Sequence, residues 1–448
     1  MALREVAPCP DITSNYCVWV LSRDALCAPV MYKSCQASSL HWHFYTNFGR
    51  EPPVLHFPAN ALAYSLENFL GEVRQACGQP LRMPIQLRWG GGLGSAVHSL
   101  QVVASWADGG DSNLTLQLPE AFGSQENTRE RFSSTLQGMA ALYFADSIRC
   151  DGTSFSRYKA LEVVAPRVAA MQSEAFRDTL RGQGVALCCF AGAKSEFLGP
   201  LYARPEHGAV RDISDFRVLL PRILQHVGDR ASDSLDDGKL DYVSGLIHQL
   251  FLNADEHGSF DAMGEPYERA MRGIVLRLTP VTNRAELVRV AGDDRAFRTY
   301  LSRLALLSPK QTVSQEEHEK LPSGPMQLLE ISVFDTGPGL ALRWLAEKIG
   351  RRTYAEIPQE EEVEAVKTCF KKHATTKASQ YFGQGLPVAL GAMKRLNAFM
   401  TLRTGRLSLY QDFSRLDTME FQPKNRFPRV DALPVIAGTG YTVYFRVK

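Results

Sequence analysis

Apolar and polar positions in the second half of the chain follow clear periods. Residues 239–257 carry apolar side chains at helical spacing and predict an amphipathic helix. Apolar runs at 272–280 and 328–337 predict strands, and the stretch of about 281–326 between them is expected to be an irregular insert. The remaining elements predicted here are helices over 340–349, 360–372 and 386–397 and strands over 399–404, 406–412 and 440–448. This order predicts an α/β sandwich in which helices cover one face of a mixed sheet.

The first half, residues 1 to about 230, predicts a separate α/β region. It carries a helical pattern over residues 59–77. The segment 228–239, "GDRASDSLDDGK", is small, acidic and without apolar periodicity, and is the best candidate for a linker. We therefore expect two domains, 1–230 and 239–448, the first a sensor or partner-binding region. Strands are also predicted over residues 85–89, 98–107, 113–119 and 185–190.

A polar stripe ends the predicted helix 239–257, in the segment "LFLNADEHGS". Gln249, Asn253 and His257 are spaced four residues apart, so they share one face of the helix. Polar residues at a helix end are commonly solvated, but three on one face also suit a binding site.

Three glycine-containing stretches follow. "DTGPG" places Asp335 at a strand end, before Gly337 and Gly339, which let backbone approach a ligand closely. "FGQGL" places Gly383 and Gly385 just before a helix, an arrangement that suits a phosphate. "AGTGYTVYF" opens the last strand. Each stretch alone is compatible with an ordinary turn.

In this order, the four stretches resemble the Bergerat-fold ATP-binding domains of the GHKL superfamily, which includes histidine kinases, anti-sigma-factor kinases and Hsp90-type chaperones. "LNADEHG" is similar to the N box, in the form typical of anti-sigma kinases, and "DTGPG" to the DxGxG box. "HATTKASQYFGQGL" is similar to the ATP lid, and "GTGYTVYF" to the final glycine–threonine box. The resemblance covers roughly residues 239–448.

The resemblance implies ATP and Mg²⁺ as cofactors and assigns roles to residues. Asn253 would bind the Mg²⁺ that bridges the ATP phosphates, and Asp335 would accept from the adenine amine. Gly337 and Gly339 would leave room for the adenine, and Thr442 would support the aspartate and a bound water. The lid residues implied at the phosphates are Gly383, Gly385 and Leu386, with Lys377 either a γ-phosphate contact or a solvated lysine.

Catalysis is less well defined than binding. Members of the family that hydrolyse ATP efficiently carry a glutamate four residues before the asparagine, where this chain has Gln249. An amide orients a water but does not accept its proton as a carboxylate does. His257 and Glu256 are alternative bases. We expect a slow ATPase or a nucleotide-gated switch that signals to the N-terminal region or a partner; the alternatives are a protein kinase acting on Ser or His of a partner, and a binding module without turnover.

Composition adds limits to these expectations. The chain of 448 residues has a net charge of +2, which gives no strong nucleic-acid signal. Its nine cysteines include no CxxC pair, and its first ten residues lack the apolar core of a signal peptide. No run reaches the length of a membrane span. We expect a cytoplasmic protein with reduced thiols and a protein partner; its oligomeric state is open, a homodimer among the options.

Overall fold

The computed structural model divides the chain into two compact units, Met1–Pro53 and Val54–Lys448. In the first unit, β1 (Met31–Gln36) pairs antiparallel with β2 (Ser39–Phe44). The predicted division at 230–239 does not coincide with this one. The structure describes residues 31–36, 39–44, 53–86, 94–108, 113–205, 208–228, 235–306, 321, 324–372, 385–415, 419–430 and 432–447.

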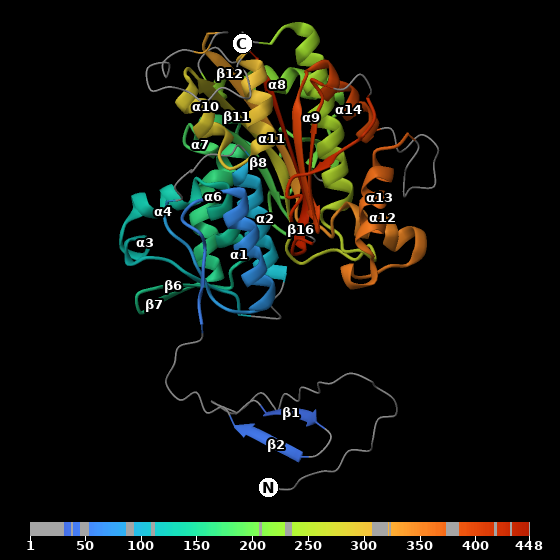
Figure 1. Ribbon diagram of the computed structural model, residues 1–448. Coiled ribbons are helices and arrows are strands. Elements are labelled where there is room, and N and C mark those ends of the chain that lie inside the picture. The colour runs from blue at the N-terminus through green and yellow to red at the C-terminus, as the bar shows by residue number, and fades with distance from the viewer. Residues whose placement is uncertain are drawn as a thin grey trace. The chain divides into compact units, whose positions relative to one another are not determined.

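A seven-stranded sheet forms the centre of the second unit (Figure 1), in the order β15-β14-β13-β16-β12-β11-β8. Its strands are β8 (Val185–Phe190), β11 (Met271–Val281), β12 (Met326–Asp335), β13 (Phe399–Gly405), β14 (Leu407–Asp412), β15 (Lys424–Asn425) and β16 (Ile436–Arg446). Each neighbouring pair is antiparallel. A mixed sheet was predicted for residues 239–448, but the sheet that contains these residues is antiparallel, and the mixed sheet lies among the N-terminal residues.

The mixed sheet has five short strands in the order β3-β4-β5-β6-β7, parallel except for the last pair. They are β3 (Leu55–His56), β4 (Leu81–Arg82), β5 (Thr115–Gln117), β6 (Ser147–Cys150) and β7 (Thr153–Ser156). The helices of this part are α1 (Ala63–Gln75), α2 (Ser95–Asp108), α3 (Glu120–Ser124), α4 (Glu126–Ser133), α5 (Leu136–Phe144), α6 (Arg157–Gln172), α7 (Phe176–Thr179) and α8 (Ile213–Val227). A further short pair is β9 (Tyr202–Arg204) with β10 (Ala209–Val210).

Helices cover both faces of the seven-stranded sheet, so the expectation of helices on one face is wrong. One face contacts α8, α9 (Asp237–His257) and, through α9, α14 (Gly385–Arg395). The other contacts α2 at β16, and α10 (Arg284–Ala291) and α11 (Arg295–Leu304) share an apolar cluster with Leu328 and Tyr444. Of the helices on this second face, α2 was expected to belong to another domain, and α10 and α11 come from the segment that was expected to be irregular.

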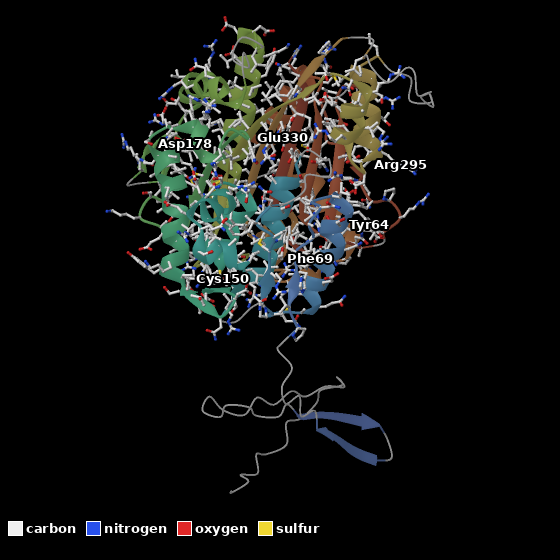
Figure 2. The ribbon with its side chains drawn as sticks, turned by 90° about the vertical axis from the view of Figure 1, so that its left-hand side faces the viewer. Tyr64, Phe69, Cys150, Asp178, Arg295 and Glu330 are labelled. Carbon is white, nitrogen blue, oxygen red and sulfur yellow. The ribbon has the colours of Figure 1, made fainter. Side chains whose placement is uncertain are left out.

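Helix α2 corrects the prediction of a strand over 98–107. Its polar residues are buried together with its apolar ones: Ser99 and Gln101 are fully buried. Helical periodicity is detectable in a sequence only when one side of the helix faces water, so the usual signal is missing here. At its start, the Gly94 N–H donates to Glu330 Oε1 (3.0 Å), and Figure 2 shows Glu330 among the strands of the sheet. Burial raises the pKa of Glu330.

The two helices that follow β12 agree closely with the prediction. Helices α12 (Leu340–Ile349) and α13 (Gln359–Cys369) flank a short 3-10 turn, Tyr354–Glu356.

One continuous apolar core joins α1 and α2 to α9 and α14. Within the described part of the chain, every helix is too short or too polar to span a lipid bilayer.

Candidate functional site

Asp335 is a buried carboxylate at the end of β12, 4% exposed. Its Oδ1 accepts hydrogen bonds from the backbone N–H of Gly337 (2.9 Å) and of Thr439 on β16 (3.2 Å). Burial raises the pKa of Asp335 to about 7, although both N–H donors favour the ionised form. The side chain is therefore held by one of its oxygens, and its pKa lies near neutral pH.

The turn after Asp335 is fixed by three neighbouring segments. The Gly438 N–H donates to the Gly337 carbonyl oxygen (2.7 Å), and the Tyr354 hydroxyl donates to the Pro338 carbonyl oxygen (3.0 Å). Gly339 has a φ of +86°, a conformation that favours glycine. The Leu340 N–H, which opens α12, donates to Thr404 Oγ1 on β13 (3.0 Å). "DTGPG" thus forms a rigid turn.

The end of α9 packs directly on this turn. A Cβ added to Gly258 would collide with the side chain of Asp335, and one added to Gly337 would lie 2.8 Å from the His257 carbonyl oxygen. Gly258 has ordinary helical dihedrals, so space, not backbone conformation, requires a glycine here. The structure therefore brings together two motifs that lie about 80 residues apart in the sequence.

The predicted polar stripe lies on the last turns of α9. Gln249, Asn253 and His257 are all partly exposed. The Gln249 amide nitrogen lies 3.1 Å from His248 Nδ1, and its oxygen would be 2.7 Å from a Cβ at Gly385. Asn253 makes no side-chain hydrogen bond to the described residues, so its amide is available to a ligand.

Asp255, which belongs to the same polar segment, has a structural role that the sequence did not indicate. Its Oδ1 accepts from Arg272 Nε (2.7 Å) and from the Tyr202 hydroxyl (2.5 Å). Arg272 is 2% exposed and also donates to Glu196 Oε1 (3.2 Å). Although Arg272 pairs with Asp335 in the sheet register, its guanidinium bonds to Asp255. In the sequence, the sign of this role was a charged residue, Arg272, at the start of a predicted apolar strand.

The lid is only partly described. Lys377 and Gly383 lie outside the described residues. Gly385 begins α14, next to Gln249, and Leu386 is buried in the first turn of that helix. The start of α14 is thus placed beside α9, on the same side of the sheet as Asp335.

Thr442 is not brought to Asp335. It pairs with Ser332 in the sheet, and the two hydroxyl oxygens lie 3.0 Å apart. Since side chains alternate along a strand, Thr442 and Asp335 point to opposite faces. Thr439 is the threonine beside the aspartate, and its hydroxyl lies 3.2 Å from that of Thr404. Sequence reasoning missed Thr439 although it stands between Gly438 and Gly440.

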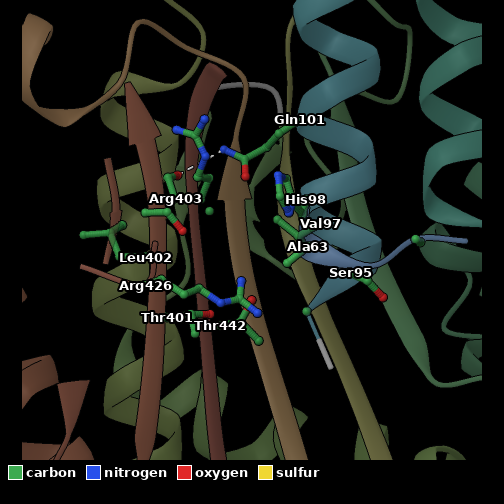
Figure 3. A pocket seen from close by; sticks show the side chains of 14 residues that line it. Ala63, Ser95, Val97, His98, Gln101, Thr401, Leu402, Arg403, Arg426 and Thr442 are labelled. Carbon is green, nitrogen blue, oxygen red and sulfur yellow. Dashed lines mark hydrogen bonds between the residues drawn. The ribbon is translucent and has the colours of Figure 1, made fainter. Parts of the chain in front are cut away.

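The opposite face of β16 is held by α2. The Gln101 amide nitrogen donates to the carbonyl oxygens of Arg403 and Ala437 (both 3.2 Å), and the Ala437 N–H donates to Ser105 Oγ (2.8 Å). Figure 3 shows Gln101 and His98 on α2 facing Arg403 and Thr442 on the strands. Helix α2 therefore holds β16, the strand that carries Thr439, by hydrogen bonds to its backbone.

A small cavity of about 30 Å³ lies between α2 and the strands, enough for about two water molecules. Ser95 Oγ and Gln101 Oε1 at its wall are buried without a hydrogen-bond partner among the described residues. Next to it, Arg403 forms a bidentate pair with Glu67 on α1 (2.7 and 2.9 Å). His98 Nε2 lies 3.1 Å from the same carboxylate, and burial lowers the pKa of His98. This polar layer ties α1 and α2 to the sheet.

Magnesium fits the site only together with phosphate. Among the described residues, no group of three or more histidine, cysteine or carboxylate side chains is arranged to hold a metal ion. Asn253 offers a single neutral oxygen, and Mg²⁺ commonly takes one or two protein ligands, with phosphates and waters completing its shell.

The geometry therefore combines a buried aspartate, a rigid glycine turn and a polar helix end. The resemblance to Bergerat-fold domains rests on the sequence motifs alone. Comparison of the chain with models of protein families, with curated proteins and with solved structures gives no match.

Proposed function

We propose that the chain binds Mg·ATP at the junction of α9, the "DTGPG" turn and β16, and acts as a slow ATPase or nucleotide-gated switch. The observation that carries this proposal is the environment of Asp335. Its two backbone hydrogen bonds fall on Oδ1, so Oδ2 is left to accept from a ligand. A buried carboxylate held in this way suits an exocyclic amine such as that of adenine.

The phosphates would lie along the polar side of α9. Asn253 would provide an oxygen to the Mg²⁺, and the start of α14 would direct backbone N–H groups at the phosphates. Gln249 lies beside Gly385, where it would orient a water near the phosphates but not take its proton. Turnover is therefore expected to be slow.

The signal would reach the N-terminal residues through β16. The Thr439 backbone N–H in this strand donates to Asp335, and the backbone of the same strand is hydrogen-bonded to Gln101 and Ser105 of α2. A change in the position of the aspartate on binding nucleotide would thus be transmitted to a helix on the other side of the sheet.

The test uses γ-labelled ATP with Mg²⁺ on the full chain, comparing wild type with Asp335→Asn and Asn253→Ala. We expect wild type to bind, Asp335→Asn to lose binding, and Asn253→Ala to lose the Mg²⁺-dependent part. Slow release of free phosphate would indicate a switch-type ATPase, and label on a protein would indicate the kinase alternative. Failure of wild type to bind ATP would refute the proposal.

A further inference from the structure

A second pocket, of about 580 Å³, lies among the N-terminal elements, away from the nucleotide site proposed above. It is formed by α4, the start of α5, the loop after α7, and Ile85 and Gln86 after β4. This volume lies in the range of small-molecule sites, roughly 300–1,000 Å³. The residues that define its chemistry are Asn127, Arg131, Thr135, Gln137, Arg181 and Gln183.

The pocket is positively charged. Arg131 and Arg181 line it from two different segments, and none of the described lining residues is a carboxylate. The nearby carboxylate, Glu130, lies 3.1 Å from Arg167 and 3.7 Å from Arg181. Two arginines thus share one carboxylate, and Arg131 has no ion pair among the described residues, which leaves an excess of positive charge at the pocket.

The two lining arginines also have amide partners. The Gln86 amide, turned with its oxygen toward the guanidinium, accepts from Arg131 Nε (3.0 Å). Arg181 Nη1 lies 3.5 Å from the amide oxygen of Asn127. Amides are neutral, so Arg131 keeps its charge toward an anion in the pocket, and Arg181 is compensated only in part, because it shares the Glu130 carboxylate with Arg167.

Gln137 gives an independent indication of a ligand. It lies on α5, lines the pocket and is only 2% exposed. Its Oε1 is buried without a hydrogen-bond partner among the described residues. An unsatisfied buried amide oxygen is unfavourable, so we expect a ligand or a water to complete its hydrogen bonding.

From this geometry we propose that the pocket binds a small organic anion carrying a phosphate or carboxylate group. The two guanidinium groups take the anionic group, and the Gln137 amide bonds a polar atom at the inner end of the ligand. This site is independent of the proposed ATP site. Arg181 and Gln183 lie on the loop that leads into β8, so binding occurs beside an edge strand of the main sheet.

The test is calorimetric titration of the full chain with inorganic phosphate and with citrate, at constant ionic strength and without nucleotide or Mg²⁺. We expect at least one of the two anions to bind saturably, and the one that does identifies the group recognised. Arg131→Gln and Arg181→Gln should each weaken binding about tenfold or more. The control is Arg177→Gln on α7, an exposed arginine outside the lining that changes the net charge equally.

The variant Gln137→Leu distinguishes a loss of anion binding from a loss of folding. Since the variant removes an unsatisfied buried amide, we expect it to raise the melting temperature of the unliganded protein and to weaken anion binding. Absence of saturable binding by both anions overturns the proposal. So does equal weakening in Arg177→Gln and Arg181→Gln, which would indicate general surface charge.

Discussion

The amide of Gln101 on α2 donates to the carbonyl oxygen of Ala437, 3.2 Å away at the start of β16. It also donates to Arg403, so one buried side chain holds two strands. Replacing Gln101 with leucine leaves two buried carbonyls without this donor, which costs about 1–3 kcal/mol.

We therefore expect Gln101→Leu to lower stability and to weaken ATP binding about tenfold, because β16 positions Thr439 against Asp335. Urea unfolding and nucleotide titration measure the two effects. Gln225→Leu, at an exposed position of α8, is the matched control. Unchanged ATP affinity in Gln101→Leu would show that α2 does not position the site.

Asp335 predicts a specific pH dependence of stability. Its pKa is about 7 in the folded chain, against an ordinary value of 3.8. Between these values the folded form holds the proton more tightly than the unfolded form, so stability falls as pH rises through this window. The difference of about 3 pKa units corresponds to roughly 4 kcal/mol at most.

The comparison is between wild type and Asp335→Asn without ligand, by urea unfolding at pH 5, 6, 7 and 8. The asparagine is neutral throughout, so wild type should lose stability relative to the variant as pH rises. Tyr267 and Tyr441, which interact with this carboxylate, have pKa values raised above the ordinary tyrosine range and do not titrate here. Parallel pH profiles would contradict the prediction.

Two glycines of α9 should respond oppositely to alanine. Gly258→Ala places a methyl group against Asp335, and we expect a loss of about 1–3 kcal/mol together with loss of ATP binding. Gly245→Ala has no atom within 4 Å of its new methyl group, and we expect a gain of about 0.5–1 kcal/mol. Thermal unfolding of the two variants tests this, and a stabilised Gly258→Ala would refute the packing argument.

The Arg272–Asp255 pair should behave as a buried ion pair. Asp255→Asn leaves a buried arginine without its nearest carboxylate, and we expect a loss of about 3–5 kcal/mol, reduced by the remaining Glu196. Asp255→Leu with Arg272→Met should recover part of this loss. A double-mutant cycle by urea unfolding gives the coupling energy, and additive effects would show that the contact contributes little.

Gln249→Glu tests whether slow turnover follows from the missing base. A carboxylate at this position can accept the proton of the attacking water, so we expect faster phosphate release, about 10²-fold or more. His257→Ala in wild type should lower the residual rate if His257 acts as the base. If Gln249→Glu binds ATP and the rate is unchanged, the water is not activated from this position.

Local patterns predicted most of the second half of the chain correctly. Helix α12 and strands β11 and β12 were anticipated to within one or two residues, because each buries one side or bears a continuous apolar run. Asp335 and Gly258 meet where the end of α9 packs on the end of β12, and the glycine-containing motifs in the sequence indicated this site. Strand alternation places Thr439 and Thr442 on opposite faces, and the pairing of β12 with β16 decides which of them lies beside Asp335.

The remaining features depend on long-range packing. Helix α2 buries Gln101 and Ser99, so its sequence has no solvent-facing side to reveal the helical period. The insert of 281–326 contains α10 and α11, whose apolar side chains meet Phe399 and Tyr444 far along the chain. The pairing of β8 with β11 joins residues 185–190 to a sheet that the sequence assigned entirely to residues after 239.

This pairing limits how far the motifs of the proposed nucleotide site can be treated as a transferable module. A fragment of residues 239–448 would lose β8 and leave the edge of β11 unpaired, and without α2 it would expose the back of β16. Unpaired edges invite association with other chains. In this protein the motifs and their supporting layer share one core, so we expect the motifs to fold only when both are expressed as one piece.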